Sequence, residues 1–238
     1  MMITSLENKT VKELTKLHQK KYREGRFLIL ENDLIGKALR RGKLLQLIYT
    51  GEVPFSFENS LEVSEEVLDK IAGEKGRRYI GVSAMIEESF DPQSRVLLLD
   101  HLQDPLNIGR IMEASLHFGF DSLIMSKDCA DIYNEKCLRN CYGGIYDLHI
   151  CTGDLIEKIA QLKAKGFAVY ATGLRNDTHD LYSVKTEEKM AFVLGNEGSG
   201  VTAEVMDACD GTIKIDMHNI DSLNVGMAAS IVMYRFRT

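Results

Sequence analysis

From residue 95 onward, short apolar runs alternate with amphipathic stretches of helical period. The apolar runs are continuous rather than alternating, which is typical of parallel strands buried on both faces. This pattern predicts an open α/β sheet with helices on both sides, whose ligands bind at the carboxyl ends of the strands. The predicted strands are 96–100, 122–125, 148–151, 167–173, 191–195 and 212–217, and the predicted helices are 107–118, 134–141, 154–166, 202–209 and 222–236.

The first part of the chain has the pattern of a smaller α/β unit. Residues 8–24 place apolar side chains at helical spacing with lysines between them, which predicts a basic amphipathic helix. A polar stretch at 87–94 is interpreted as a linker, so we expect two domains, residues 1–86 and 95–238. Within the first domain, strands are predicted at 27–30, 44–50 and 77–85 and helices at 33–42 and 63–73.

The net charge of −6 over 238 residues hides a local excess of positive charge. Residues 1–45 contain eleven Lys and Arg against five Asp and Glu, so this block carries +6. A basic segment on an acidic body can bind phosphate groups, because the interaction is local and is screened beyond about 10 Å. An exposed, solvated helix explains the same composition, and charge alone favours that explanation.

The composition also narrows the class of protein. No apolar run approaches the ~20 residues that span a bilayer, and the first residues lack the apolar core of a secretory signal. The five cysteines include no C-x-x-C pair, so neither a disulfide framework nor a structural zinc site is expected. We expect a cytoplasmic protein without a metal and without membrane attachment.

The loop after the predicted strand 96–100 is polar and reads Asp-His-Leu-Gln-Asp-Pro-Leu-Asn-Ile-Gly. Because Pro105 disfavours an earlier helix start, we expect Asn107 at the helix entrance, where its amide would cap backbone N–H groups. An ordinary capped turn and a substrate-holding cluster both fit this sequence. Arg110 and Glu113 follow one turn apart, a spacing that allows them to pair.

The loop after the predicted strand 191–195 is rich in glycine and contains one carboxylate, Glu197. Its G-x-x-G-x-G spacing differs from the dinucleotide-binding fingerprint and from the phosphate-binding loop that ends in G-K-[ST]. The glycines are expected to let backbone approach a ligand closely, and the carboxylate favours a cationic ligand over a pyrophosphate. A tight turn without a ligand is the simpler explanation of this loop taken alone.

The third loop precedes the last predicted helix and reads Ile-Asp-Met-His-Asn-Ile-Asp-Ser-Leu-Asn-Val. Ser222 is expected to cap this helix. The Gly and Ala residues that follow allow its backbone to pack closely against a neighbour. A buried C-terminal helix with a serine cap explains the segment without a ligand.

Taken in order, the motifs D-x-x-Q-D-P-x-N-x-G, L-G-x-E-G-x-G and I-x-M…S-L-N-V-x-x-A-A resemble those of the SpoU/TrmH family. Residues 3–23 are similar to the start of that family's accessory RNA-binding domain, which is itself similar to a ribosomal-protein fold. The resemblance implies transfer of methyl from S-adenosylmethionine to a ribose 2′-hydroxyl of ribosomal or transfer RNA. It also implies a homodimer and a C-terminal trefoil knot, which the periodicity does not show and which is rare among folds.

The resemblance also assigns roles to individual residues. Six of them would bind the cofactor: Leu194, Gly195, Ile215, Met217, Leu223 and Val225. Asn107, Glu197, Ser222 and Asn224 would line the place where the ribose meets the methyl donor. The expected RNA contacts are Lys12, Lys16, Lys20 and Arg23, near one side of the predicted N-terminal helix, and Arg139 in a further family segment.

A departure from the family falls in the first motif, where Glu113 stands in place of an arginine thought to contact RNA and help activate the hydroxyl. Arg110, three residues earlier, could supply that guanidinium with Glu113 as its orienting partner. Alternatively, Glu113 could accept the proton itself if burial made it a stronger base. We count both among the candidate catalytic residues. If neither Arg110 nor Glu113 takes part in catalysis, the protein binds cofactor and RNA without methyl transfer, for example in ribosome assembly.

On the α/β pattern alone, a nucleotide-dependent enzyme such as a dehydrogenase is an alternative. Glu197 would repel a pyrophosphate, and the dinucleotide spacing is missing. The three motifs therefore favour the methyltransferase interpretation.

Overall fold

The computed structural model describes residues 2–175, 178–218 and 223–238. The chain forms two compact units, Met1–Glu87 with Tyr133–Tyr146 and Glu88–Ile132 with Asp147–Thr238, which we call the first and the second unit. Among the helices of the described residues, none is both long and apolar enough to cross a membrane.

The first unit contains strands β1 (Arg26–Ile29), β2 (Leu44–Tyr49), β3 (Ser60–Glu62) and β4 (Tyr79–Ala84), helices α1 (Lys9–Lys16), α2 (Asn32–Arg40) and α3 (Glu65–Ala72), and a 3-10 turn at Lys20–Tyr22. The four strands form one sheet in the order β1-β4-β2-β3. β3 lies parallel to β2, and the other neighbours are antiparallel. α1 and α3 pack on this sheet through an apolar cluster that includes Val11, Leu14, Ile71 and Val82.

The helix predicted at 8–24 is shorter in the structure, where α1 ends at Lys16. Arg23 is 3% exposed and donates from Nε to the carbonyl oxygen of Leu17 (3.1 Å) and from a terminal nitrogen to that of His18 (3.4 Å). These bonds satisfy carbonyls that the helix end leaves unpaired. Arg23 was predicted to lie near one side of this helix and to contact RNA. It instead follows the helix, and its guanidinium is buried against the helix end.

A segment from the middle of the sequence also belongs to the first unit. Tyr133 packs against Phe27 with ring centroids 4.7 Å apart, and Tyr146 donates to the hydroxyl of Ser83 (2.7 Å). The compact units thus differ from the predicted ranges 1–86 and 95–238. Residues 133–146 lie within the second predicted range but pack with the first unit. The segment contains α5 (Glu135–Asn140) and a 3-10 turn (Gly144–Tyr146).

The second unit contains strands β5 (Arg95–Asp100), β6 (Ser122–Met125), β7 (His149–Thr152), β8 (Ala168–Thr172), β9 (His179–Asp180), β10 (Met190–Gly195) and β11 (Gly211–Lys214). They form one sheet in the order β7-β6-β5-β10-β8-β11-β9. Every neighbouring pair in it is parallel, as the apolar pattern predicts. β5 and β10, whose residues are all buried, lie side by side within it.

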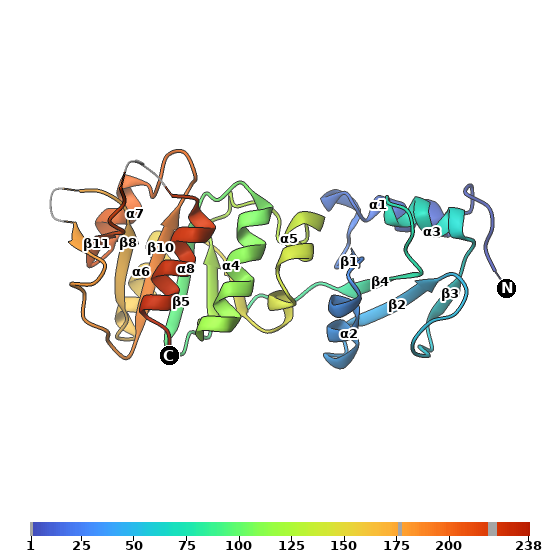
Figure 1. Ribbon diagram of the computed structural model, residues 1–238, viewed down its shortest axis with the longest axis horizontal. Coiled ribbons are helices and arrows are strands. Elements are labelled where there is room, and N and C mark those ends of the chain that lie inside the picture. Colours follow the sequence, from blue (N-terminus) through green and yellow to red (C-terminus); the bar gives the residue numbers. More distant parts are fainter. Residues whose placement is uncertain (1, 176–177, 219–222) are drawn as a thin grey trace. The chain divides into compact units, whose positions relative to one another are not determined.

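Helices cover both faces of this sheet (Figure 1). On one face lie α4 (Pro105–Phe118) and α8 (Val225–Arg235), which contact each other. On the other face, α6 (Leu155–Ala164) and α7 (Ala203–Ala208) join the strands in a core cluster. The predicted open α/β sheet is confirmed. The two strands that the pattern did not predict, β3 and β9, are short and lie at sheet edges.

The observed starts of α4 and α8 change the roles expected for two asparagines. α4 begins at Pro105, which lacks the N–H that a first turn leaves unpaired, and Asp104 caps the helix by accepting from Leu106 N (3.0 Å). Asn107 is therefore inside the first turn rather than at the cap. α8 is capped by Asn224, and the predicted cap, Ser222, lies outside the described residues.

Candidate active site

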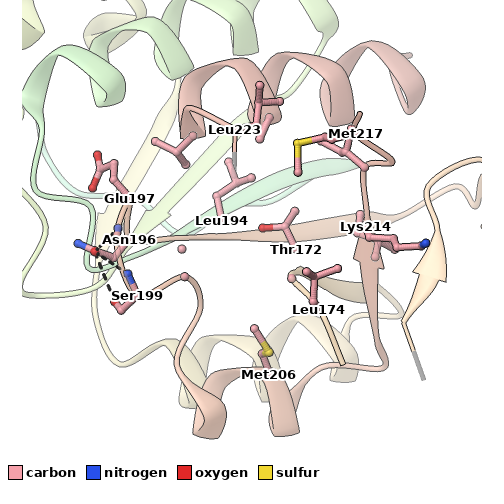
Figure 2. A pocket seen from close by; sticks show the side chains of 18 residues that line it. Thr172, Leu174, Leu194, Asn196, Glu197, Ser199, Met206, Lys214, Met217 and Leu223 are labelled. Atoms are coloured by element: carbon pink, nitrogen blue, oxygen red, sulfur yellow. Dashed lines mark hydrogen bonds between the residues drawn. The ribbon is translucent and has the colours of Figure 1, made fainter. Parts of the chain in front are cut away.

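A cavity of about 430 Å³ is lined by residues at the carboxyl ends of β8, β10 and β11. Figure 2 shows apolar side chains from several elements around it, including Leu194, Met206, Met217 and Leu223. The structure thus brings together two loops that are separate in the sequence. All six residues expected to bind the cofactor line this cavity: Leu194, Gly195, Ile215, Met217, Leu223 and Val225.

Asn196 organises the glycine-rich loop that forms one wall of the cavity. Its Nδ2 donates to the carbonyl oxygen of His101 (2.8 Å). Its Oδ1 accepts from the backbone N–H groups of Gly198 (2.9 Å) and Ser199 (3.2 Å), within the loop that Figure 2 shows. The backbone of Asn196 also exchanges two hydrogen bonds with Gly200, of 3.1 and 2.9 Å. The loop is therefore a closed turn that its own hydrogen bonds hold in place.

Gly195 is required by the geometry of this loop. A Cβ at Gly195 would overlap the backbone of Gly200 and Val201. A Cβ at Gly198 would instead meet the side-chain oxygen of Asn196 at 3.5 Å, which is an ordinary contact. The loop itself therefore already requires glycine at Gly195. The close approach of a ligand to this backbone stays a prediction.

Asp100, the last residue of β5, holds the far end of the loop. It is 1% exposed, and its Oδ2 accepts from the backbone N–H (2.8 Å) and the hydroxyl (2.9 Å) of Thr202. The next residue, His101, has a φ of +57° and contacts Asp100 Oδ1 through Nδ1 (2.7 Å). Residues 100 and 101 therefore hold both ends of the loop. This role of Asp100 was not predicted, although a carboxylate that ends an otherwise apolar run is a usable signal.

Three of the residues expected at the ribose form a chain of hydrogen bonds. Asn224 donates from Nδ2 to Asn107 Oδ1 (3.1 Å), and Asn107 donates from Nδ2 to Glu197 Oε1 (3.0 Å). Asn107 is 2% exposed, so the surrounding protein fixes the orientation of its amide. These two hydrogen bonds join the starts of α4 and α8 to the glycine-rich loop.

Glu197 lines the cavity as an ionised carboxylate. Burial acts to raise its pKa, but hydrogen bonds from Asn107 and from the backbone N–H groups of Glu197, Gln103 and Asp104 outweigh burial and hold the pKa below its usual range. A carboxylate that keeps its charge beside an apolar cavity favours a cationic ligand.

Arg110 and Glu113 line a separate groove of about 670 Å³ between α4 and α8. A Cβ at Gly226 would lie 3.6 Å from Asn107 Oδ1 and 3.9 Å from Arg110 Cβ, so the Arg110 side chain starts beside the asparagine pair. Arg110 is exposed and Glu113 is half-buried. In the described part of the chain no ion pair joins Arg110 to Glu113, so the expected orienting pair is not formed in this structure.

The residues expected to contact RNA differ in their surroundings. Lys12, Lys16 and Lys20 are exposed, and Lys12 forms an ion pair with Glu7. Arg139 lies among carboxylates, with nitrogen to oxygen distances of 3.2 Å to Glu31, 3.1 Å to Glu74 and 2.6 Å to Glu135. Arg139 therefore anchors α5 within the first unit, which leaves its guanidinium less suited to a phosphate.

An open parallel sheet with a pocket formed by strand-end loops defines a class of ligand-binding α/β proteins. Within this class, residues 94–234 match the SpoU rRNA Methylase family. The chain belongs to this family.

Relatives extend the similarity to the whole chain. The 23S rRNA (guanosine(2553)-2′-O)-methyltransferase RlmP of Bacillus subtilis (strain 168) is 30% identical over 245 residues, which cover 99% of this chain and 98% of that protein. The crystal structure of an rRNA methyltransferase from Sinorhizobium meliloti has a TM-score of 0.89 at 25% identity and covers 99% of this chain and 96% of its own. A structure of the AdoMet-bound rRNA methyltransferase from the same organism has the same fold, with a TM-score of 0.89, 24% identity and the same coverage.

Proposed function

We propose that this protein is an S-adenosylmethionine-dependent 2′-O-ribose methyltransferase that acts on ribosomal RNA. Family membership and the similarity to the Bacillus subtilis enzyme over nearly all of both chains support this reaction and substrate class. The observation that carries the proposal is the Asn224–Asn107–Glu197 chain of hydrogen bonds beside an apolar cavity. It supplies fixed polar groups next to a pocket suited to a nucleoside.

The cavity fits S-adenosylmethionine in its chemistry. Pockets for small ligands are mostly apolar with a few fixed polar groups, and this cavity has that character. Leu194, Met217 and Val225 would surround the adenine, and Glu197 would stabilise a neighbouring positive charge. When bound, S-adenosylmethionine supplies a methyl group on a positively charged sulfur.

In the proposed transfer, the ribose 2′-oxygen forms a bond to the methyl carbon while the bond from that carbon to sulfur breaks. The hydroxyl proton leaves to a base, either Glu113 or water. The protein orients the ribose, and the fixed amides of Asn107 and Asn224 serve this purpose, with Ser222 in the role that the family resemblance implies. We place Arg110, which starts beside these amides, in contact with the RNA, where it stabilises developing negative charge.

The direct test is transfer of a labelled methyl group from S-adenosylmethionine to 23S rRNA transcribed without modifications. We expect 2′-O-methylated nucleotides after complete digestion of the RNA, identified by mass spectrometry. Transfer to a base rather than to ribose would contradict the proposed reaction. Unmodified transfer RNA in a parallel reaction tests the substrate class.

A second candidate function is binding of cofactor and RNA without catalysis, and Glu113 in place of the family's arginine favours it. Calorimetry with S-adenosylmethionine then gives binding, while the labelled RNA assay gives no product with any RNA. The two candidates are therefore separated by experiments on the same preparation.

We further propose that the first unit binds RNA through Lys12, Lys16 and Lys20 and that the second unit carries out the transfer. The groove between α4 and α8 would be covered by a second copy of the chain, because Met227 and Tyr234 on α8 are 58% and 59% exposed. Light scattering would then report a homodimer, and Met227→Glu would shift it towards monomer. Action on ribosomal RNA is consistent with a cytoplasmic location.

A further inference from the structure

Two lysine ammonium groups gather over one tyrosine ring in the first unit. The Nζ atom of Lys16 lies 5.4 Å from the centre of the Tyr22 ring, and that of Lys21 lies 4.8 Å from it. Both distances allow a cation–π attraction, which acts within about 6 Å. The two ammonium groups are therefore at most about 10 Å apart, which is one screening length in about 0.1 M salt, so their potentials add. We call Lys16, Lys21 and Tyr22 the lysine–tyrosine cluster.

The positive charge of this cluster is accessible. Among the described residues, no carboxylate forms an ion pair with either of its lysines, whereas Lys9 and Lys12 earlier in α1 pair with Glu13 and Glu7. Both lysines of the cluster are exposed, and Tyr22 is 39% exposed. An anion can therefore reach the two ammonium groups without first displacing a carboxylate.

Backbone turns after α1 place the ring beside the helix end. The Gln19 N–H donates to the carbonyl oxygen of Lys16 (2.9 Å), and the Tyr22 N–H donates to that of Gln19 (3.0 Å). Val11 and Leu14 of α1 are 1% and 2% exposed, so the helix is firmly seated on the sheet. A fixed backbone therefore presents the cluster, which lowers the cost of ordering it around a ligand.

The buried Arg23 makes the end of α1 more favourable for an anion. The carbonyl end of a helix carries partial negative charge, which repels anions. The Arg23 guanidinium donates to the carbonyl oxygens of Leu17 (3.1 Å) and His18 (3.4 Å) at this end. Its positive charge offsets the negative end of the helix directly beneath the cluster.

We propose that Lys16 and Lys21 together bind one backbone phosphate of the RNA and that the Tyr22 ring holds the two ammonium groups in place for it. Like charges repel each other when no anion is bound, and the ring offsets part of that repulsion. The inference rests on the proposed function, and it adds Lys21 and Tyr22 to the contacts proposed for the first unit. Duplex and single-stranded RNA both carry such phosphates, so the site is expected to bind both.

Salt-dependent binding of a labelled RNA duplex and of one of its strands alone to the full chain tests the proposal. A phosphate shared by two lysines counts once in counterion release. Lys16→Gln with Lys21→Gln is therefore expected to reduce the slope of log affinity against log salt by about one and to lower affinity roughly tenfold for both RNAs. Lys9→Gln, at an exposed lysine of the same helix that has no ring beside it, is the matched control and is expected to change affinity less than about threefold.

A second pair of variants tests the ring. Tyr22→Leu keeps both charges but no longer holds them together, so affinity is expected to fall roughly three- to tenfold for duplex and single strand alike, at an unchanged salt slope. Tyr22→Phe keeps the ring and is expected to bind within about twofold of the parent. Thermal unfolding of each variant checks that the fold is kept.

Parental affinity in the double lysine variant or in Tyr22→Leu would overturn the proposal. A slope reduction of about two would mean that the lysines bind separate phosphates, and a Tyr22→Leu loss confined to the single strand would mean that the ring stacks on a base. Both results would contradict a shared phosphate. If the parent methylates ribosomal RNA and the cluster variants bind like the parent, the inference alone is wrong. If the variants lose RNA binding as expected but the parent transfers no methyl group, the proposed reaction alone is wrong.

Discussion

Asn107 donates a hydrogen bond to Glu197 across 3.0 Å, although the two residues are ninety positions apart in the sequence. Asn107 comes from the first turn of α4, and Glu197 comes from the loop after β10, so the bond joins two strand-end motifs. It also helps to keep the pKa of Glu197 low. The site therefore presents a fixed negative charge, and the consequences of that charge are measurable.

Glu197→Gln keeps the size of the side chain and removes its charge. We expect affinity for S-adenosylmethionine to fall roughly tenfold, because solvent weakens the attraction between the partly exposed Glu197 carboxylate and the positively charged sulfur. Affinity for S-adenosylhomocysteine, whose sulfur is neutral, is expected to stay within about twofold. Calorimetry with both ligands measures the difference. Glu188→Gln, at an exposed carboxylate ahead of β10, is the matched control. Equal losses for both ligands would contradict a role for charge.

The low pKa of Glu197 also predicts how stability depends on pH. A carboxyl group whose pKa is lower in the folded state stabilises the fold above its unfolded pKa, and this contribution is lost as the pH falls through the folded pKa. The Tm of Glu197→Gln is therefore expected below that of the parent at neutral pH, with a difference that shrinks below about pH 4.5, the ordinary value for this group. Calorimetric scans across this range check the trend. A difference independent of pH would mean that the substitution acts through packing.

Gly195→Ala and Gly198→Ala form a matched pair in one loop. A Cβ at Gly195 would displace the backbone of Gly200 and Val201, so we expect loss of most affinity for S-adenosylhomocysteine together with a lower Tm. Gly198→Ala is expected to keep both within a small change, because its Cβ has room. Calorimetry and thermal unfolding of both variants measure these effects. Parental binding in Gly195→Ala would mean that the cofactor does not use this loop.

Arg110→Lys tests the proposed RNA contact beside the asparagine pair. Lysine keeps the charge but loses the bidentate geometry of the guanidinium, so we expect single-turnover methyl transfer to slow by at least about tenfold at unchanged cofactor affinity. Glu113→Gln in the same assay separates the two roles of Glu113: a loss of about 10²–10⁴ would identify it as the proton acceptor, and little change would leave that role to water. Parental rates in Arg110→Lys would remove Arg110 from the mechanism.

Lys16→Glu with Lys20→Glu is expected to weaken binding to all RNA sequences and to lower its salt dependence, because both side chains are exposed. Arg23→Gln is expected to act differently. Its buried guanidinium bonds two carbonyls at the end of α1, so the loss is expected in stability, by about 1–3 kcal/mol. Salt-dependent RNA titrations and thermal unfolding distinguish the two effects.

The parallel sheet of the second unit was predictable because its central strands are buried on both faces and read as continuous apolar runs, as in β5 and β10. The edge strands β3 and β9 were missed because two or three residues carry no period. The start of the first helix was predictable, but its end was not, since it depends on the carbonyls that Arg23 captures from six residues away.

The candidate cofactor residues come from motif resemblance, and the geometry around them could not be predicted in the same way. Asn107 looked like a helix cap, yet Asp104 performs that task and leaves the Asn107 amide to Glu197. Asn196 shapes the loop through its bond to His101, 95 residues away, and Asp100 through its bonds to Thr202, 102 residues away. Such long-range bonds leave no local pattern. The trefoil knot stays a prediction from the resemblance.

Residues 133–146 pack in the first unit although they lie between two stretches of the second. Tyr133 and Tyr146 meet Phe27 and Ser83 there, and the apolar side of α5 is buried. The chain therefore passes between the units three times. Exchange of the first unit between relatives would have to move residues 1–87 and 133–146 together. The two stretches are therefore expected to be inherited as one block and to change together during evolution.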